Sequence, residues 1–391
     1  MLGSIFVGLS GLEAYSEGLK KVSNNVSNLN STGFKTSTVT FSNLQSTRDS
    51  GGSALTNGAQ SWGGGVSLSD STINFKAGDL QTTNNDLDLA VDGTGFLVLL
   101  KGSDVRYVRT GSFTTDKSGN IVLSGTEWKL ATLDSTGRAV AVSIDSSRTN
   151  APVTTTKVVF ADNLSSTGTT ASVNDIAVYD ASGGKHVWTA TFTRAENSTN
   201  WTVTVKDSTG ATIGTSALNF ENSIPSAASA KSTFTDSSTG LAVLFDFSSG
   251  VTSFSSGTVS SLRAASVDGH AVGALTTVAV NDAGELQLTY SNEQTKNLGA
   301  VAVATFRDTS ALTQESAGLF QAKVGADVQL MASADDRVGL VRSKRLEGSN
   351  VDLSKEFGDL ILIQRGYQAS SQIISVSNDM IQQLFGIRGQ G

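Results

Sequence analysis

Apolar residues recur every seven positions near the C-terminal end of the chain. A seven-residue repeat is the pattern of a helix that buries one seam against another helix. We therefore predict a helix over residues 350–386, with Ser349 and Asp352 as a capping box and Gly386 as its terminator. Charged residues within it, among them Glu356, Asp359, Arg365 and Asp379, argue against a membrane span. The residues assigned to the seam are Leu353, Phe357, Leu360, Ile363, Tyr367, Ile374, Ile381 and Leu384.

The N-terminal end carries the same repeat. Its seam residues are Ile5, Leu9, Leu12, Leu19, Val22, Val26 and Leu29, so the two ends are natural partners. Several Asn and Ser residues lower the helix propensity of residues 2–30. We therefore expect this helix, with Gly33 as its stop, to be marginal alone and to become ordered on assembly.

Between the two ends the pattern is that of strands and turns. Leu87, Leu89 and Val91 alternate with acidic residues, which predicts a half-buried strand. Asp-x-x-Gly tetrapeptides begin at residues 116, 134, 180 and 207, and this composition is typical of tight hairpin turns. The predicted fold is mainly β with long α-helical termini, in which the terminal helices form a coiled-coil-like inner domain and two stacked β domains lie outside it.

The same patterns divide the chain into four parts. Residues 1–33 with 350–391 form a terminal helical assembly domain, and residues 34–70 form a linker arm, either flexible or extended along neighbours. Residues 71–145 with 285–349 form the first β domain, and residues 146–284 an inserted outer β domain. Within the insertion, apolar alternation around Trp188 and Trp201 predicts a hairpin.

Composition narrows the function further. The 391 residues are only 16% charged, with a net charge of −7 and no basic run, which argues against a nucleic-acid partner. The absence of cysteine excludes disulfides, thiolate nucleophiles and cysteine metal sites. No Lys or Arg precedes the first apolar residues, so we expect no Sec signal peptide and export, if any, by another route.

Candidate chemistry is sparse. His186 and His270 have no second His or Cys with ligand spacing, so we expect no metal site. Asp86, Asp88 and Asp92 are interleaved with apolar residues, which favours a strand with an acidic face over a calcium loop. We expect no catalytic residues and no cofactor.

Four sequence blocks together resemble the flagellar rod and hook protein family. The first contains Asn25, Asn28, Gly33 and Phe34, and the second Leu87, Asp88, Gly93, Gly95 and Phe96. The third contains Arg109, Gly111 and Phe113, and the fourth Asn350, Asp352, Gln364 and Arg365. The blocks occur in order and cover both ends and the first β domain, whereas residues 146–284 carry no motif of the family.

The resemblance implies a structural, non-enzymatic subunit. The long insertion favours hook members of the family over distal rod members. The resemblance then implies self-assembly into a curved, flexible helical tube, a universal joint that passes torque from rod to filament. It also implies contacts with rod, hook-cap and hook–filament junction proteins, export by the flagellar type III apparatus, and a place in the extracellular hook and basal body without membrane insertion.

Three other interpretations remain open at this stage. The two helices are also compatible with an intramolecular hairpin inside an ordinary core. A β-rich surface adhesin or phage-tail-like protein with a helical stalk would share the same layout. A secreted glycan hydrolase would need acidic pairs such as Asp335 and Asp336, which are also common in turns.

Overall fold

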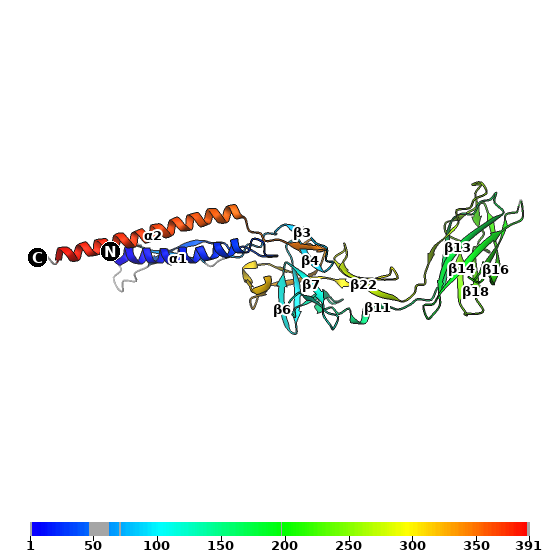
Figure 1. The fold of residues 1–391 in the computed structure, drawn as a ribbon, viewed down its shortest axis with the longest axis horizontal. Helices are drawn as coiled ribbons and strands as arrows, with labels where there is room; N and C mark the ends of the chain where they lie inside the picture. The colour runs from blue at the N-terminus through cyan, green and yellow to red at the C-terminus, as the bar shows by residue number, and fades with distance from the viewer. Residues whose placement is uncertain (1, 47–61, 70–71, 197, 389–391) are drawn as a thin grey trace, which may run out of the picture. The chain divides into compact units, whose positions relative to one another are not determined.

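The computed structural model describes residues 2–46, 62–69, 72–196 and 198–388. The chain is mainly β, with one long helix at each end (Figure 1). It divides into two compact units. The first comprises Met1–Asp145, Val278–Gln287 and Asn297–Gly391, and the second Ser146–Thr277 and Leu288–Lys296. The expected insertion, residues 146–284, begins at the same residue as the second unit.

Helix α2 (Leu353–Arg388) begins at a side-chain cap. Asp352 Oδ1 accepts hydrogen bonds from the backbone N–H groups of Ser354 (2.9 Å) and Lys355 (3.2 Å), which are otherwise without intrahelical partners. The N-cap is therefore Asp352 and not Ser349. Gly386 lies inside the helix and does not terminate it.

Helix α1 (Leu2–Ser27) ends earlier than the sequence predicted. The Asn28 side chain donates to the carbonyl of Asn24 (2.9 Å), one of the local bonds by which Asn competes with continued helix. Gly33 lies six residues beyond the end of the helix, in a turn with φ of +69°. It is a turn residue and not the helix stop.

A hairpin replaces the expected linker arm. Strands β1 (Phe41–Ser46) and β2 (Trp62–Leu68) pair antiparallel and pack against α1. The rings of Phe41 and Tyr15 lie 5.0 Å apart, and the Val66 N–H donates to Ser10 Oγ (3.2 Å). The two strands pair with each other, and β2 lies along one side of the helix. Most of the Gly- and Ser-rich stretch, residues 47–61, lies outside the described residues.

The first unit has a large sheet with the path β26-β27-β6-β5-β9-β8-β7-β4-β29. Its core contains Phe96, Val98, Tyr107, Phe306, Leu312 and Phe320. The strands are β4 (Asp88–Asp92), β5 (Phe96–Lys101), β6 (Asp104–Val108), β7 (Thr110–Thr115), β8 (Ile121–Leu123), β9 (Lys129–Leu133), β10 (Ala139–Ala141), β25 (Ala302–Phe306), β26 (Leu312–Gln314), β27 (Phe320–Ala322), β28 (Val328–Ala332) and β29 (Leu340–Ser343). A separate pair, β3 (Leu80–Thr82) and β30 (Arg345–Glu347), precedes α2.

Strand β4 is more buried than the alternation predicted. It pairs with β7 on one side and β29 on the other, and residues 88–91 are all buried. A central strand covered on both faces loses the polar face that alternation implies. The expected half-buried strand is therefore a strand, but a central one.

The second unit has two five-stranded sheets around a shared aromatic core that includes Trp188, Trp201, Phe160, Phe192 and Phe245. Their strands are β12 (Lys157–Asn163), β13 (Thr170–Tyr179), β14 (Lys185–Thr193), β15 (Asn200–Lys206), β16 (Thr212–Glu221), β17 (Ile224–Pro225), β18 (Lys231–Thr235), β19 (Ala242–Asp246), β20 (Val251–Thr252) and β21 (Arg263–Val267). The predicted hairpin is present as β14 and β15. Strands β11 (Thr149–Asn150), β22 (Gly273–Val280), β23 (Glu285–Tyr290) and β24 (Thr295–Ala300) form a four-stranded sheet.

The Asp-x-x-Gly turns form as the sequence predicted. In the turn at Asp134, Oδ1 accepts from the N–H groups of Thr136 (2.8 Å) and Arg138 (2.9 Å), and Gly137 has φ of +79°. Asp116, Asp180 and Asp207 accept in the same way from N–H groups two and four residues later. These turns connect consecutive strands, and in one of them Asp180 Oδ2 also pairs with His186 Nε2 (2.9 Å).

Candidate assembly site

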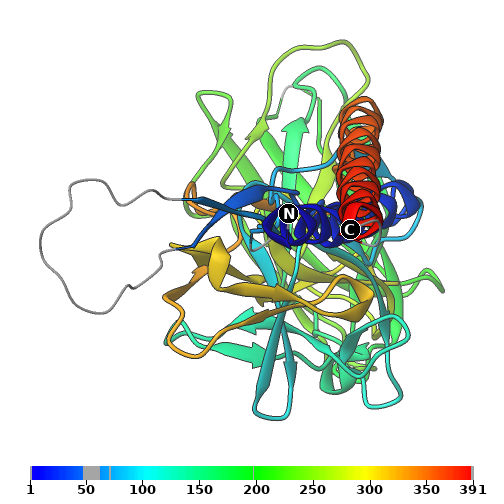
Figure 2. The same ribbon diagram turned by 90° about the vertical axis from the view of Figure 1, so that its left-hand side faces the viewer.

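The two terminal helices form an antiparallel pair, seen end-on in Figure 2. We call their contact line the seam. It is built from layers in which the α1 numbers rise by seven as the α2 numbers fall by seven. The layers are Ser4 with Ser377, Gly11 with Ser370, Gly18 with Ile363, and Asn25 with Glu356. A heptad repeat is therefore present in both helices, as predicted, but most residues of the seam are small or polar.

Small residues let the helices approach closely. A Cβ added to Gly11 would lie 2.4 Å from Ser370 Oγ, and one added to Gly8 would lie 2.8 Å from Ile374 Cγ1. From the other side, a Cβ on Gly366 would lie 2.4 Å from the Tyr15 ring. A larger residue at any of these positions would force the neighbouring side chain to shift, so the glycines favour the close packing.

A buried polar layer closes the seam where the helices meet the β body. The Asn25 Nδ2 group donates to both carboxylate oxygens of Glu356 (3.1 Å each) and to the Ser37 carbonyl (3.0 Å). The Ser37 N–H donates back to Asn25 Oδ1 (3.1 Å). Burial raises the pKa of Glu356, although the Asn25 hydrogen bond opposes this shift. Asn25 thus joins α1, α2 and the chain that leaves α1.

The large apolar residues predicted for the seam lie mostly beside it. Val22 and Ile363 are fully buried, whereas Leu9 is 55% and Phe357 52% exposed. The half-buried members are Ile5, Leu12, Leu19, Val26, Leu29, Leu360, Ile374 and Ile381, and the exposed members also include Leu353 and Tyr367. The side chain of Leu384 lies outside the described residues. The predicted apolar residues lie beside the contact line because small residues, Gly and Ser, occupy the contact itself. Apolar periodicity gives no signal for such residues.

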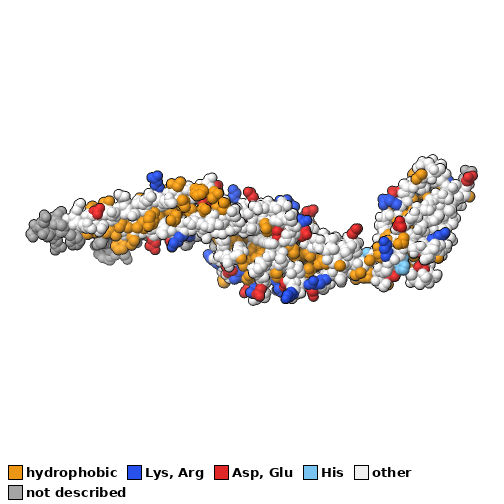
Figure 3. All heavy atoms as spheres, in the orientation of Figure 1, with side chains coloured by type: hydrophobic (Ala, Val, Ile, Leu, Met, Phe, Trp, Pro, Cys, Tyr) orange, Lys and Arg blue, Asp and Glu red, His pale blue; other side chains and the backbone are white. Residues whose placement is uncertain are grey.

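A second line of apolar residues on α2 contacts no part of the described chain closely enough to bury it. It consists of Leu362, Ala369, Ile373, Val376 and Met380, which we call the outer stripe. Leu362, Ala369 and Val376 are seven residues apart, as are Ile373 and Met380, so they share one side of the helix. Hydrophobic side chains are prominent along the helix pair in Figure 3. Monomeric soluble proteins rarely expose a regular apolar line of this kind.

A buried ionic cluster joins the segment that follows the C-terminal end of α1 to the segment that precedes the N-terminal end of α2. We call this cluster the buried junction. Glu347, directly before α2, pairs with Lys35 after α1 and with Arg109 of the sheet (Nε–Oε2 3.2 Å), and all three side chains are at most 2% exposed. Gly78 N–H adds a bond to the same carboxylate (2.8 Å). Burial lowers the pKa of Lys35, and the adjacent Glu347 carboxylate partly restores it.

Arg109 fixes the far side of the buried junction. Its guanidinium donates to the carbonyls of Gly93 (2.6 Å), Gly95 and Val91 (3.3 Å), and it lies 5.6 Å from the centroid of the Phe96 ring. Every donor nitrogen therefore has a partner, which a buried charge requires.

Backbone contacts complete the connection. The Gly33 N–H donates to the Glu347 carbonyl (2.7 Å), and a Cβ at Gly33 would lie 2.9 Å from Thr110 Cγ2. Asn350 accepts from the Thr36 N–H (2.9 Å) and donates to the carbonyls of Asn74 (2.7 Å) and Lys76 (2.9 Å).

The family blocks thus meet at one place. Residues of all four blocks, including Gly33, Gly93, Gly95, Arg109 and Asn350, contact one another or the same partners around Glu347. Leu87 and Phe113 pair through the sheet (2.9 Å), Asp88 accepts from Asn85 (2.9 Å), and Gly111 lies in β7. Phe34 accepts from the Asn350 N–H (3.3 Å), whereas Gln364 and Arg365 are exposed on α2 and lie away from this cluster. Sequence reasoning missed Lys35 and Glu347 as partners because their separation in the chain hides the contact.

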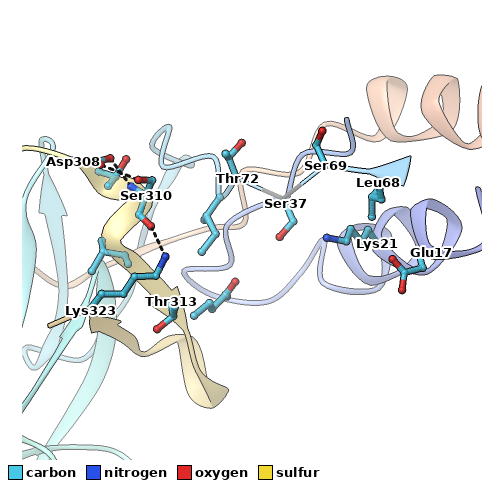
Figure 4. A pocket seen from close by; sticks show the side chains of 14 residues that line it. Glu17, Lys21, Ser37, Leu68, Ser69, Thr72, Asp308, Ser310, Thr313 and Lys323 are labelled. Carbon is cyan, nitrogen blue, oxygen red and sulfur yellow. Dashed lines mark hydrogen bonds between the residues drawn. The ribbon is translucent and has the colours of Figure 1, made fainter. Parts of the chain in front are cut away.

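One hollow in the described part of the chain is polar. It has a volume of about 940 Å³ and is lined by side chains such as Glu17, Lys21, Ser37, Asp308 and Lys323 (Figure 4). Within the described ranges, no group of three or more His, Asp or Glu side chains is arranged to hold a metal ion. No described helix is long and apolar enough to cross a membrane.

Comparison with known proteins places this geometry in context. Residues 342–387, which contain β30 and most of α2, match the family described as flagellar basal body rod FlgEFG protein C-terminal. The chain is 27% identical to the flagellar hook protein FlgE of Escherichia coli over 97% of this chain and 98% of that protein. It is 28% identical to FlgE of Salmonella typhimurium over the same shares, and 24% identical to FlgE of Treponema pallidum over 99% and 100%.

A solved structure supports the fold. The Helicobacter pylori flagellar hook protein FlgE2 superposes with a TM-score of 0.51 at 12% identity, covering 68% of this chain and 100% of that one. Together, the matches show that the chain is similar to flagellar proteins of the rod and hook class. The particular members that it resembles along nearly its whole length are hook proteins, a structural and not an enzymatic family.

Proposed function

We propose that this chain is the structural subunit of a bacterial flagellar hook. Copies assemble head to tail into a curved, flexible helical tube outside the cell, which passes torque from rod to filament. The observation that carries the proposal is that different faces of the terminal helices hold different kinds of residue. Small residues form the intramolecular seam, and large apolar residues such as Leu9, Phe357 and Leu362 remain on the outside for neighbouring copies.

The mechanical role follows from the contrast between the helices and the rest. Apolar burial between helices is worth about 25 cal/mol per Å² and makes the inner contacts firm. The β units present surfaces rich in Ser, Thr and Gly, whose mutual contacts are weaker and able to slide. In this arrangement the helices form a coiled-coil-like inner layer and the β domains stack outside it. A head-to-tail contact that does not close into a ring generates such a polymer.

The partners follow from this position. The tube ends on rod proteins at one side and on hook–filament junction proteins at the other, with a hook-cap protein during growth. Subunits travel through the flagellar type III export apparatus. The chain acts without catalysis and without a cofactor.

Electron microscopy of the concentrated protein tests the proposal. We expect short curved tubes, and an increase in helical circular dichroism as they form, because the marginal terminal helices gain partners. A chain without residues 1–30 should form no tubes, whereas an adhesin with a helical stalk would keep its binding after this deletion. A full-length protein that stays monomeric at every concentration contradicts the proposal.

A further inference from the structure

The outer stripe of α2 has the geometry of a second helix-binding surface. Its residues repeat at the same seven-residue interval as the seam, and Leu362 is 71% exposed. Helix α2 packs one heptad line against α1 and exposes another to solvent. It therefore has surfaces for two helical partners.

The stripe also contains a receptor for large side chains. A shallow groove of about 430 Å³ is lined by Ala369, Ile373, Val376 and Met380 together with Ser4 of α1. The groove is therefore continuous with the seam. A small residue, Ala369, between larger ones forms a hole into which a side chain of a facing helix fits.

The matching protrusion lies on α1. Phe6 is 68% and Leu9 55% exposed, and Ile5 and Leu12 beside them are half-buried. We call these four residues the α1 flank. Charge is complementary at the edges, because exposed Glu13 lies one turn beyond Leu9, and exposed Arg365 lies between Leu362 and Ala369 along α2.

We propose that the outer stripe of one copy binds the α1 flank of the next copy, with Phe6 and Leu9 entering the groove around Ala369. This inference rests on the proposed function and specifies which faces meet. Two different faces are needed because a stripe that bound its own equivalent would give a closed two-fold dimer, whereas stripe against flank leaves both faces free for further copies.

The absence of cysteine allows a clean cross-linking test. Single variants Ala369→Cys and Leu9→Cys are assembled alone and as a mixture, tube formation is scored by microscopy, and the tubes are then oxidised. We expect a disulfide-linked dimer after oxidation of the mixed tubes. Tubes made from either variant alone should give no dimer. Ser371→Cys, exposed on the same helix but about 200° around it from Ala369, is the matched control and should give no dimer with Leu9→Cys.

Each outcome decides the question. Dimers from Ala369→Cys alone would show that the stripe binds itself. Tubes that contain both variants but give no mixed dimer would overturn the proposed contact while leaving the hook function intact. Phe6→Cys provides a second probe of the α1 flank. A flank variant that stays out of tubes entered by Ser371→Cys supports the proposal, because the flank is then required for the contact. If the unsubstituted protein forms no tubes, the proposed function itself has failed.

Discussion

Glu347 connects the chain segments next to the two terminal helices with the sheet. Its carboxylate is the shared acceptor for Lys35 and Arg109, and none of the three side chains is more than 2% exposed. Two cations left without their anion in the interior would be strongly unfavourable, since a buried charge needs a partner. The ionic cluster thus connects the helices to the sheet.

We expect Glu347→Gln to lower the free energy of unfolding by about 3–5 kcal/mol, the range typical of breaking a buried ion pair. Urea unfolding followed by circular dichroism measures the change. Glu127→Gln is the control, because Glu127 also pairs with a lysine, Lys101, but both side chains are largely exposed. Equal effects of the two substitutions would show that the buried junction is not a special connection.

Glu356 makes the helix pair sensitive to pH. Burial raises the pKa of Glu356, so the folded chain binds a proton there more readily than the unfolded chain does. The stability that this carboxyl contributes is fully present below its unfolded pKa and is lost as the pH rises through the raised folded pKa. Thermal unfolding across this range should show Glu356→Gln gaining stability relative to the unsubstituted chain as the pH increases. A difference that stays constant with pH would contradict this account of Glu356.

At the scale of elements, the seam shows how a heptad repeat can be present while its apolar residues lie elsewhere. The layers of Gly, Ser and Asn allow α1 and α2 to lie closer than a leucine seam would. The half-buried and exposed leucines then flank the contact. The hairpin of β1 and β2 covers a further side of α1, which an arm without structure would have left open.

Substitutions at two glycines of α2 distinguish the effect of packing between the helices from the effect of helix propensity. We expect Gly366→Ala to destabilise the helix pair by about 1–3 kcal/mol, because its Cβ would overlap the Tyr15 ring. Gly358→Ala should instead stabilise it by about 0.5–1 kcal/mol, since nothing lies within 4 Å and alanine favours helix. Thermal unfolding of both variants measures the signs. Two stabilising substitutions would mean that the helices are not in close contact at Gly366.

At the scale of the whole molecule, the chain combines helices that expose unused apolar surface with β units whose cores are complete. The second unit encloses its own aromatic core, so its fold does not depend on neighbours. The helix pair exposes two apolar lines, the outer stripe and the α1 flank. That the terminal helices become ordered only on assembly stays a prediction, and the change of helicity on tube formation addresses it.

Several features could be read directly from the sequence. The strands, the Asp-x-x-Gly turns, the hairpin of Trp188 and Trp201, and the two terminal helices follow from local periodicity and turn chemistry, which act between residues close in the chain. The resemblance of four blocks pointed to the class of protein.

Other features were decided by tertiary structure alone. Which side of a heptad helix faces its partner depends on how closely two backbones approach, and Gly11 with Ser370 permits an approach that hydrophobicity does not reveal. The pairing of Glu347 with Lys35 and Arg109 joins residues more than 200 positions apart, so no local pattern encodes it. Periodicity determined that the terminal helices exist, whereas packing decided which of their faces are used within one chain and which remain for the next.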